Sequence, residues 1–208
     1  ILDERIILQK YPRIKECSNL IPIDYFGNHS IIMLPADGNL YHLIEYHRGL
    51  NNDINRNYQF IKTIYNALMC LEEKGLYYYD IKLKNILYNY KPNGDIEIFL
   101  GDIGSIQDIN DMITDIVITT YTPKGIYSKN GKTLSWLYRT NPTLYYPWAL
   151  SLLGFHLYKS KEFLQFSFDL LQDIKYQRSL NLLKREAKKN YHPYLLYYIE
   201  NICNLIEN

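Results

Sequence analysis

The residues best suited to chemistry lie between positions 80 and 102 of this chain. Asp80, Lys82 and Asn85 share one short stretch, and Asp102 follows further along. Phosphoryl transfer from a nucleotide needs an acceptor hydroxyl held in line, metal ions on the phosphates and positive charge on the migrating group. Asp80 and Lys82 could supply the first and third, while Asn85 and Asp102 carry the hard oxygen ligands that Mg²⁺ prefers. These residue types indicate chemistry on a magnesium-bound nucleotide.

A predicted helix and a predicted hairpin would hold these side chains. Residues 56–74 place apolar side chains at three- and four-residue steps, which predicts a long helix that ends at Gly75. Residues 85–90 and 95–100 predict two strands, joined by a Lys-Pro-Asn-Gly turn. The candidate residues therefore lie at the two ends of one expected hairpin.

The remaining elements predict an α+β layout with a mainly helical second half. Upstream, we expect a helix over residues 1–10, an antiparallel strand pair over 20–25 and 31–34, and a short helix over 40–47. Downstream, residues 105–143 show little periodicity. Four helices are then predicted, over residues 146–158, 161–172, 176–189 and 194–206.

Residues 78–87 resemble the catalytic loop of eukaryotic-type protein kinases, His-Arg-Asp-x-Lys-x-x-Asn, and residues 100–104 resemble their Asp-Phe-Gly motif. The resemblance implies that Asp80 is the catalytic base and that Lys82 neutralises the γ-phosphate. It implies that Asn85 and Asp102 are the two magnesium ligands. Leu87 would form the floor beneath adenine.

The resemblance extends upstream of this loop. Glu4 resembles the small-lobe helix glutamate that pairs with a phosphate-binding lysine. Residues 31–40 resemble the last small-lobe strand, the hinge and the start of the next helix, which makes Met33 the gatekeeper and the backbone from Leu34 to Ala36 the adenine reader. Four apolar positions would stack as a spine that links the lobes: Leu8, Ile23, Tyr78 and Ile103.

The resemblance implies an α+β, protein kinase-like fold. Residues 1–35 would be a remnant of the small lobe, and residues 36–208 a mainly helical large lobe with the catalytic loop and activation segment. The implied activity is transfer of the γ-phosphate of Mg-ATP to serine or threonine of protein substrates, because Lys82 belongs to the serine/threonine pattern. The implied cofactors are ATP and Mg²⁺.

Several positions depart from the family pattern. Tyr79 replaces the arginine before the catalytic aspartate, and Tyr146 stands where the central helix usually carries an aspartate. No glutamate follows the threonine–proline segment at residues 119–125. No Gly-rich loop precedes Glu4, and we expect natural sequence upstream because Ile1 opens what reads as mid-helix. These departures keep a pseudokinase, a binding or scaffolding module, open as the alternative, and a helical interaction domain as a third.

Charge and composition limit the partners. A formal net charge of +1, with 23 basic and 22 acidic residues interspersed, gives no reason to expect a nucleic acid or an anionic membrane as partner. No continuous apolar stretch of about 18 residues predicts a membrane span. Cys17, Cys70 and Cys203 lack metal-ligand spacing. We expect reduced packing thiols in a cytoplasmic, intracellular compartment, with ATP and a protein substrate as partners.

Overall fold

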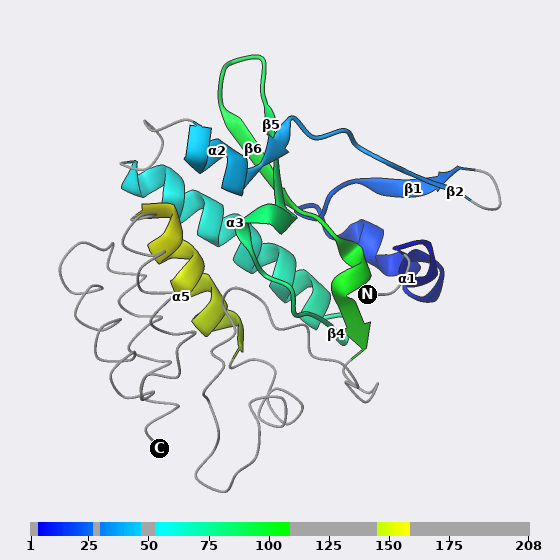
Figure 1. The fold of residues 1–208 in the computed structure, drawn as a ribbon. Coiled ribbons are helices and arrows are strands. Elements are labelled where there is room, and N and C mark those ends of the chain that lie inside the picture. Colours follow the sequence, from blue (N-terminus) through cyan, green and yellow to red (C-terminus); the bar gives the residue numbers. More distant parts are fainter. Residues whose placement is uncertain (1–3, 27–29, 47–52, 109–144, 159–208) are drawn as a thin grey trace, which may run out of the picture. The chain divides into compact units, whose positions relative to one another are not determined.

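The computed structural model describes residues 4–26, 30–46, 53–108 and 145–158 (Figure 1). The chain forms two compact units. One contains residues 1–48 and 62–114, and the other contains residues 49–61 and 115–208. Every candidate site residue named above belongs to the first unit. The helices expected over 161–206 and the threonine–proline segment at 119–125 lie outside the described residues.

The first unit opens with two short helical elements, of which the sequence predicts only the first. Helix α1 (Glu4–Lys10) buries Ile7 and Leu8 completely and is followed by the 3₁₀ helix η1 (Pro12–Glu16). Pro12 suits the first position of η1, where a backbone N–H would have no partner. Further on, helix α2 (Leu40–Tyr46) confirms the short helix expected after the strand pair.

Helix α3 (Ile54–Glu72) confirms the long predicted helix, which begins two residues earlier than expected. The backbone N–H of Arg56 donates to Oδ1 of Asp53 at 3.0 Å, so the Asp53 side chain caps the first turn. The helix ends at Glu72, and Gly75 adopts φ +72° in the turn that follows. That left-handed conformation carries little cost for glycine and commonly ends helices.

The described residues of the first unit also form three small antiparallel sheets. The predicted pair forms as β1 (Ile23–Phe26) and β2 (Ser30–Met33). The predicted hairpin forms as β5 (Ile86–Tyr90) and β6 (Ile96–Leu100), and β3 (Gly38–Asn39) adds to the free edge of β5. In Figure 1 the hairpin projects away from α1.

The third sheet was not expected from the sequence. It pairs β4 (Leu76–Tyr78) with β7 (Ile106–Asp108), so part of the segment taken for an irregular loop is a strand. Tyr78 pairs with Ile106. The sheet therefore ties the chain just before the Asp80 loop to the chain just after Asp102.

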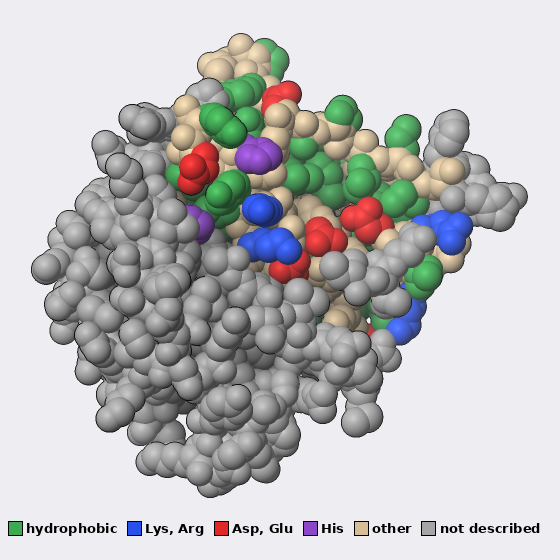
Figure 2. Space-filling model, viewed as in Figure 1, with side chains coloured by type: hydrophobic (Ala, Val, Ile, Leu, Met, Phe, Trp, Pro, Cys, Tyr) green, Lys and Arg blue, Asp and Glu red, His purple; other side chains and the backbone are tan. Residues whose placement is uncertain are grey.

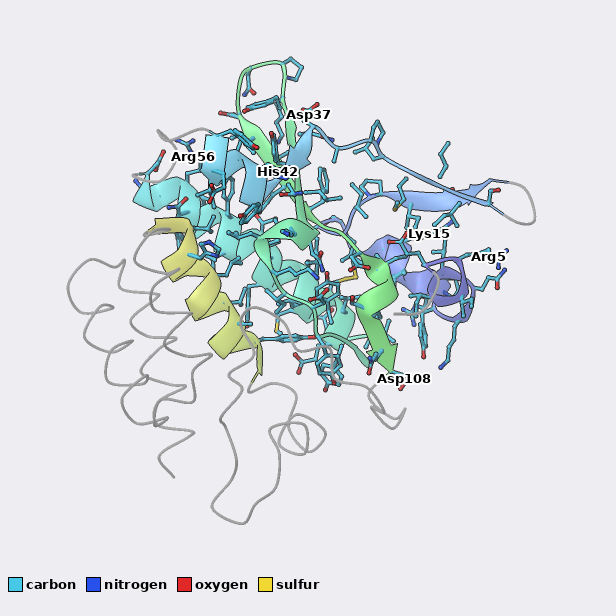
Figure 3. The ribbon with its side chains drawn as sticks, in the orientation of Figure 1. Arg5, Lys15, Asp37, His42, Arg56 and Asp108 are labelled. Carbon is cyan, nitrogen blue, oxygen red and sulfur yellow. A yellow bond between two sulfur atoms is a disulfide. The ribbon has the colours of Figure 1, made fainter. Side chains whose placement is uncertain are left out.

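The cysteine prediction was wrong for two of the three residues. Cys17 and Cys70 form a disulfide with their Cα atoms 5.7 Å apart (Figure 3). The bond joins the segment after η1 to α3. The pairing gave no sequence signal because 53 residues separate the two cysteines and only the fold brings them together. Cys203 lies outside the described residues.

In the second unit the structure describes helix α5 (Tyr145–Tyr158), which confirms the helix expected there. The helix buries Tyr146 and His156 together with an aliphatic row formed by Ala149, Leu150, Leu153 and Leu157. No helix among the described residues has the length and hydropathy needed to cross a membrane.

Candidate active site

The loop after β4 carries three of the candidate residues. The chain leaves β4 at Tyr78, turns through the 3₁₀ helix η2 (Leu83–Asn85) and enters β5. Asp80 is fully buried and Asn85 is 7% exposed. Helix α2 packs against η2. Polar side chains are buried at this depth only when they have partners or a function.

The side-chain amide of Asn85 is the centre of the hydrogen-bond network. Its Nδ2 atom lies 2.9 Å from the backbone oxygen of Asp80 and 2.9 Å from Oδ2 of the same residue. It also lies 3.1 Å from the hydroxyl of Tyr78 and 3.3 Å from Oδ2 of Asp102. The amide nitrogen therefore faces protein acceptors, which leaves the Asn85 carbonyl oxygen, Oδ1, for a ligand.

Asp80 and Lys82 form an ion pair through Oδ2 of Asp80 and the ammonium group of Lys82. The Lys82 side chain is 29% exposed, whereas that of Asp80 is 1% exposed. Oδ1 of Asp80 is buried and has no hydrogen-bond partner among the described residues. An unpartnered buried carboxylate oxygen is costly. It is the kind of acceptor that a substrate hydroxyl could satisfy.

Asp102 has an unusual backbone. It is the one non-glycine residue in the described part of the chain with positive φ, at 52°. Its Oδ2 atom lies 3.3 Å from the amide of Asn85 and 3.4 Å from the hydroxyl of Ser105. Aspartate tolerates this conformation better than most residues, and such backbone outliers cluster at ligand sites.

The donor set fits a divalent cation of the magnesium type. Two carboxylates and one ammonium group leave the cluster of Asp80, Lys82 and Asp102 with one net negative charge. Figure 2 shows one face of the molecule, on which acidic and basic side chains lie near one another beside hydrophobic ones. The described residues contain no group of three or more His, Cys, Asp or Glu side chains that could hold a metal alone. Mg²⁺ needs no such group, since it is commonly bound by one or two carboxylates and substrate phosphates.

The expected adenine-binding residues lie on the same unit and are accessible. Met33 and Leu34 are each 41% exposed, and Ala36 is also exposed. Leu87 is half-buried, and its side chain lies against Gly101. Their apolar surface could contact a nucleobase, and the exposed backbone from Leu34 to Ala36 could form hydrogen bonds with it.

Two polar side chains fix that backbone segment to β5. The backbone N–H of Asp37 donates to Oδ1 of Asn89 at 2.8 Å, and Nδ2 of Asn89 donates to the carbonyl of Pro35 at 3.1 Å. In return, Oδ2 of Asp37 accepts the backbone N–H of Tyr90 at 2.8 Å. Asp37 lies beside the turn end of the hairpin, where β5 ends at Tyr90 (Figure 3). Sequence reasoning missed these side-chain contacts to the backbone.

Glu4 and the expected spine also lie in this unit. Glu4 is half-buried on α1, and α1 packs against the 3₁₀ helix η3 (Ile103–Ser105) that follows Asp102. The four spine positions are all buried, with exposures of 0% for Leu8, Tyr78 and Ile103 and 9% for Ile23. The burial that an apolar spine requires is therefore present at all four positions.

Tyr79 stands where the resembled catalytic-loop motif has arginine, and its surroundings differ from those of a charged side chain. The side chain is 4% exposed, and its ring lies 6.1 Å from that of Tyr77. Burial, and then the neighbouring Tyr77, raise the pKa of the Tyr79 hydroxyl well above its usual range. The group therefore stays neutral at physiological pH and cannot supply the positive charge of the arginine that it replaces.

Comparisons of the chain with protein-family models and with curated proteins find no match. The family assignment is therefore a proposal that rests on the sequence motifs. The function must be argued from the side chains of the site itself.

Proposed function

We propose that this chain is the core of a protein kinase that transfers the γ-phosphate of Mg-ATP to serine or threonine. One observation carries the proposal. The buried carboxylate of Asp80, with an unpartnered oxygen, lies in one network with Lys82, Asn85 and Asp102. An acceptor for a hydroxyl, a positive charge and two metal ligands are the parts that phosphoryl transfer requires.

Each side chain has a separate task in this account. Oδ1 of Asp80 accepts the hydrogen bond of the substrate hydroxyl and then its proton. Lys82 offsets negative charge on the transferred group. Asn85 Oδ1 and the Asp102 carboxylate would hold magnesium, which would supply positive charge to offset the negative charge of the phosphates. The ion pair with Lys82 also lowers the cost of burying the Asp80 charge.

The proposed fold follows from the same site. The β5–β6 hairpin supports the kinase-like arrangement because it brings the end of the catalytic loop beside Asp102. The exposed segment that contains Met33, Leu34 and Ala36 is the proposed adenine side, with Leu87 beneath it. We propose that residues 1–35 are a small-lobe remnant and that residues 36–208 form the large lobe.

A second candidate function is a binding or scaffolding module without catalysis. One observation favours it. Tyr146, at the position where the resembled central helix carries an aspartate, is 2% exposed. A buried tyrosine offers no carboxylate to hold the backbone of a catalytic loop. Such a protein would bind nucleotide or partner proteins and transfer nothing.

The roles predict different defects for two isosteric substitutions. We would measure binding of a non-hydrolysable ATP analogue by the natural protein over a range of Mg²⁺ concentrations. Asp102→Asn should weaken magnesium-dependent binding about tenfold or more, because it removes a charged ligand. Asp80→Asn should change binding less than threefold. The exposed residue Asp95 provides the control variant, Asp95→Asn.

The acceptor is tested by offering γ-labelled Mg-ATP with a protein mixture or with sugars and choline. Label on serine or threonine supports the proposal. Label only on the small molecules contradicts the protein-kinase assignment, and equal metal-dependent binding by the natural protein and Asp102→Asn contradicts the metal site.

A further inference from the structure

Tyr78 has a buried hydroxyl with two partners in the candidate site. The residue ends β4 and is fully buried. Its hydroxyl donates to the backbone carbonyl of Gly101 at 2.9 Å and accepts from Nδ2 of Asn85 at 3.1 Å. Gly101 immediately precedes Asp102. One hydroxyl thus contacts one proposed metal ligand and the backbone beside the other.

The direction of these bonds follows from the number of hydrogens. A hydroxyl has one hydrogen, and the Gly101 carbonyl can only accept it. The Tyr78 oxygen can still accept a hydrogen bond, and the Asn85 amide nitrogen, 3.1 Å away, is the donor that faces it. Because an amide is planar, a nitrogen held on this side fixes the carbonyl oxygen on the opposite side.

If Tyr78 only filled space in the core, its ring would be sufficient and these hydrogen bonds would not be required. The sequence resemblance assigns this position to an apolar spine, for which phenylalanine would suffice. A hydroxyl buried without partners is costly, yet here it is bonded to two polar groups of the site. The hydroxyl therefore has a role beyond filling space.

We propose that the Tyr78 hydroxyl is a positioning group that orients both metal ligands, Asn85 directly and Asp102 through the Gly101 carbonyl. The inference rests on the proposed function, since it assumes that these two residues bind metal. Groups one step behind metal ligands commonly change metal affinity by 10–100-fold when they are removed. Tyr78 is not a catalytic residue in this account, because it touches neither metal nor substrate.

Tyr78→Phe removes the hydroxyl and keeps the ring. Mn²⁺ would replace Mg²⁺ because its binding can be followed by electron paramagnetic resonance, in the presence of a non-hydrolysable ATP analogue. The variant should bind Mn²⁺ about tenfold more weakly than the natural protein. Its affinity for the nucleotide without metal should stay within twofold. A merely structural role would lower the unfolding midpoint and leave the Mn²⁺ affinity of the folded fraction unchanged.

Tyr77→Phe is the matched control. Tyr77 is the preceding residue of β4, is 4% exposed, and its side chain points to the opposite face of the strand. Removal of the Tyr77 hydroxyl should leave Mn²⁺ binding unchanged. Equal Mn²⁺ affinities for the natural protein and Tyr78→Phe would overturn the positioning role.

The experiment separates this inference from the proposed function. If the natural protein binds no Mn²⁺ with the nucleotide, both fail. If it binds Mn²⁺ and Tyr78→Phe weakens binding, the positioning role stands even where no phosphate is transferred. If Tyr78→Phe does not fold, the test is made on the ¹⁵N-labelled natural protein by nuclear magnetic resonance, which follows the side-chain amide signals of Asn85. They should shift when Mg²⁺ and nucleotide are added, and unchanged signals would overturn the inference.

Discussion

The side-chain nitrogen of Asn85 lies 3.3 Å from Oδ2 of Asp102, although 17 residues separate the two in sequence. The hairpin explains this approach, because the first pair of its register joins Ile86 to Leu100. The backbone N–H of Gly101 then donates to the Asn85 carbonyl at 2.8 Å. The proposed metal ligands are thus fixed by strand pairing. Substitutions at the open end of the hairpin, where Ile86 pairs with Leu100, should therefore alter ATP binding as well as the free energy of unfolding.

Gly101→Ala should disturb that end of the hairpin. A Cβ atom at position 101 would lie 2.9 Å from Cδ1 of Leu87 and 3.3 Å from the backbone oxygen of Asn85. We expect a loss of about 1–3 kcal/mol in the free energy of unfolding, together with weaker ATP binding. Urea unfolding and nucleotide titration would measure the two effects.

The double variant with Leu87→Ala provides the control for this prediction. Removing the Leu87 side chain makes room for the new methyl group, so the double variant should lose less stability than the sum of the single variants. If the losses in the free energy of unfolding are strictly additive, the contact with Leu87 is not the cause of the destabilisation by Gly101→Ala.

Asn89→Ala should weaken ATP binding without slowing transfer. The substitution removes the bonds from Asn89 to Asp37 and Pro35, which hold the proposed adenine-reading backbone. A loss of about 1 kcal/mol for each of the two bonds predicts an increase in the KM for ATP of about thirtyfold, with kcat nearly unchanged. Steady-state kinetics would check this.

The matched control is Asn93→Ala. Asn93 bonds to Asp95 within the hairpin turn, away from the backbone at Pro35. Its substitution should leave the KM for ATP unchanged. A similar rise in the KM for ATP in Asn89→Ala and Asn93→Ala would mean that both substitutions act by loosening the hairpin as a whole.

Loss of the Cys17–Cys70 disulfide should destabilise the protein. Closing a loop across 53 residues restricts the unfolded chain, which predicts a loss of about 2–4 kcal/mol in Cys17→Ser/Cys70→Ser. Urea unfolding would measure it, with Cys203→Ser as the control. Addition of a reducing agent should bring the natural protein to the stability of the double variant. An unfolding midpoint insensitive to reductant would contradict the pairing.

Acidification should destabilise the protein through His156. Burial lowers the pKa of His156 from 6.5 to about 4, so the unfolded chain binds a proton between these pH values that the folded protein does not. Stability attributable to this residue is present above pH 6.5 and is lost as the pH falls towards 4, by up to about 3 kcal/mol. His156→Gln should flatten the pH dependence in that window. Parallel pH profiles for both proteins would contradict the prediction.

The local part of the fold could be predicted from the sequence. The apolar spacing in α3 and the Lys-Pro-Asn-Gly turn of the hairpin are patterns that neighbouring residues determine. Because these two elements flank the loop, the sequence also indicated that Asn85 and Asp102 would approach each other. The kinase-like fold as a whole stays a prediction.

The non-local parts could not be predicted. Strands β4 and β7 have three residues each, too few for a periodic pattern, and they pair across the whole hairpin. The Cys17–Cys70 bond likewise depends on distant segments meeting. The hydroxyl of Tyr78 was missed for another reason. An apolar ring was sufficient to explain the residue until its bonds to Gly101 and Asn85 were seen.

Transfer of the γ-phosphate from labelled Mg-ATP to generic acceptor proteins tests the central claim most directly. The natural protein should be compared with its Asp80→Asn variant, which keeps the shape of the buried side chain and removes its basic oxygen. We predict label on serine and threonine that falls at least about 100-fold in the variant. No label from the folded natural protein, or equal label from both proteins, would contradict the account.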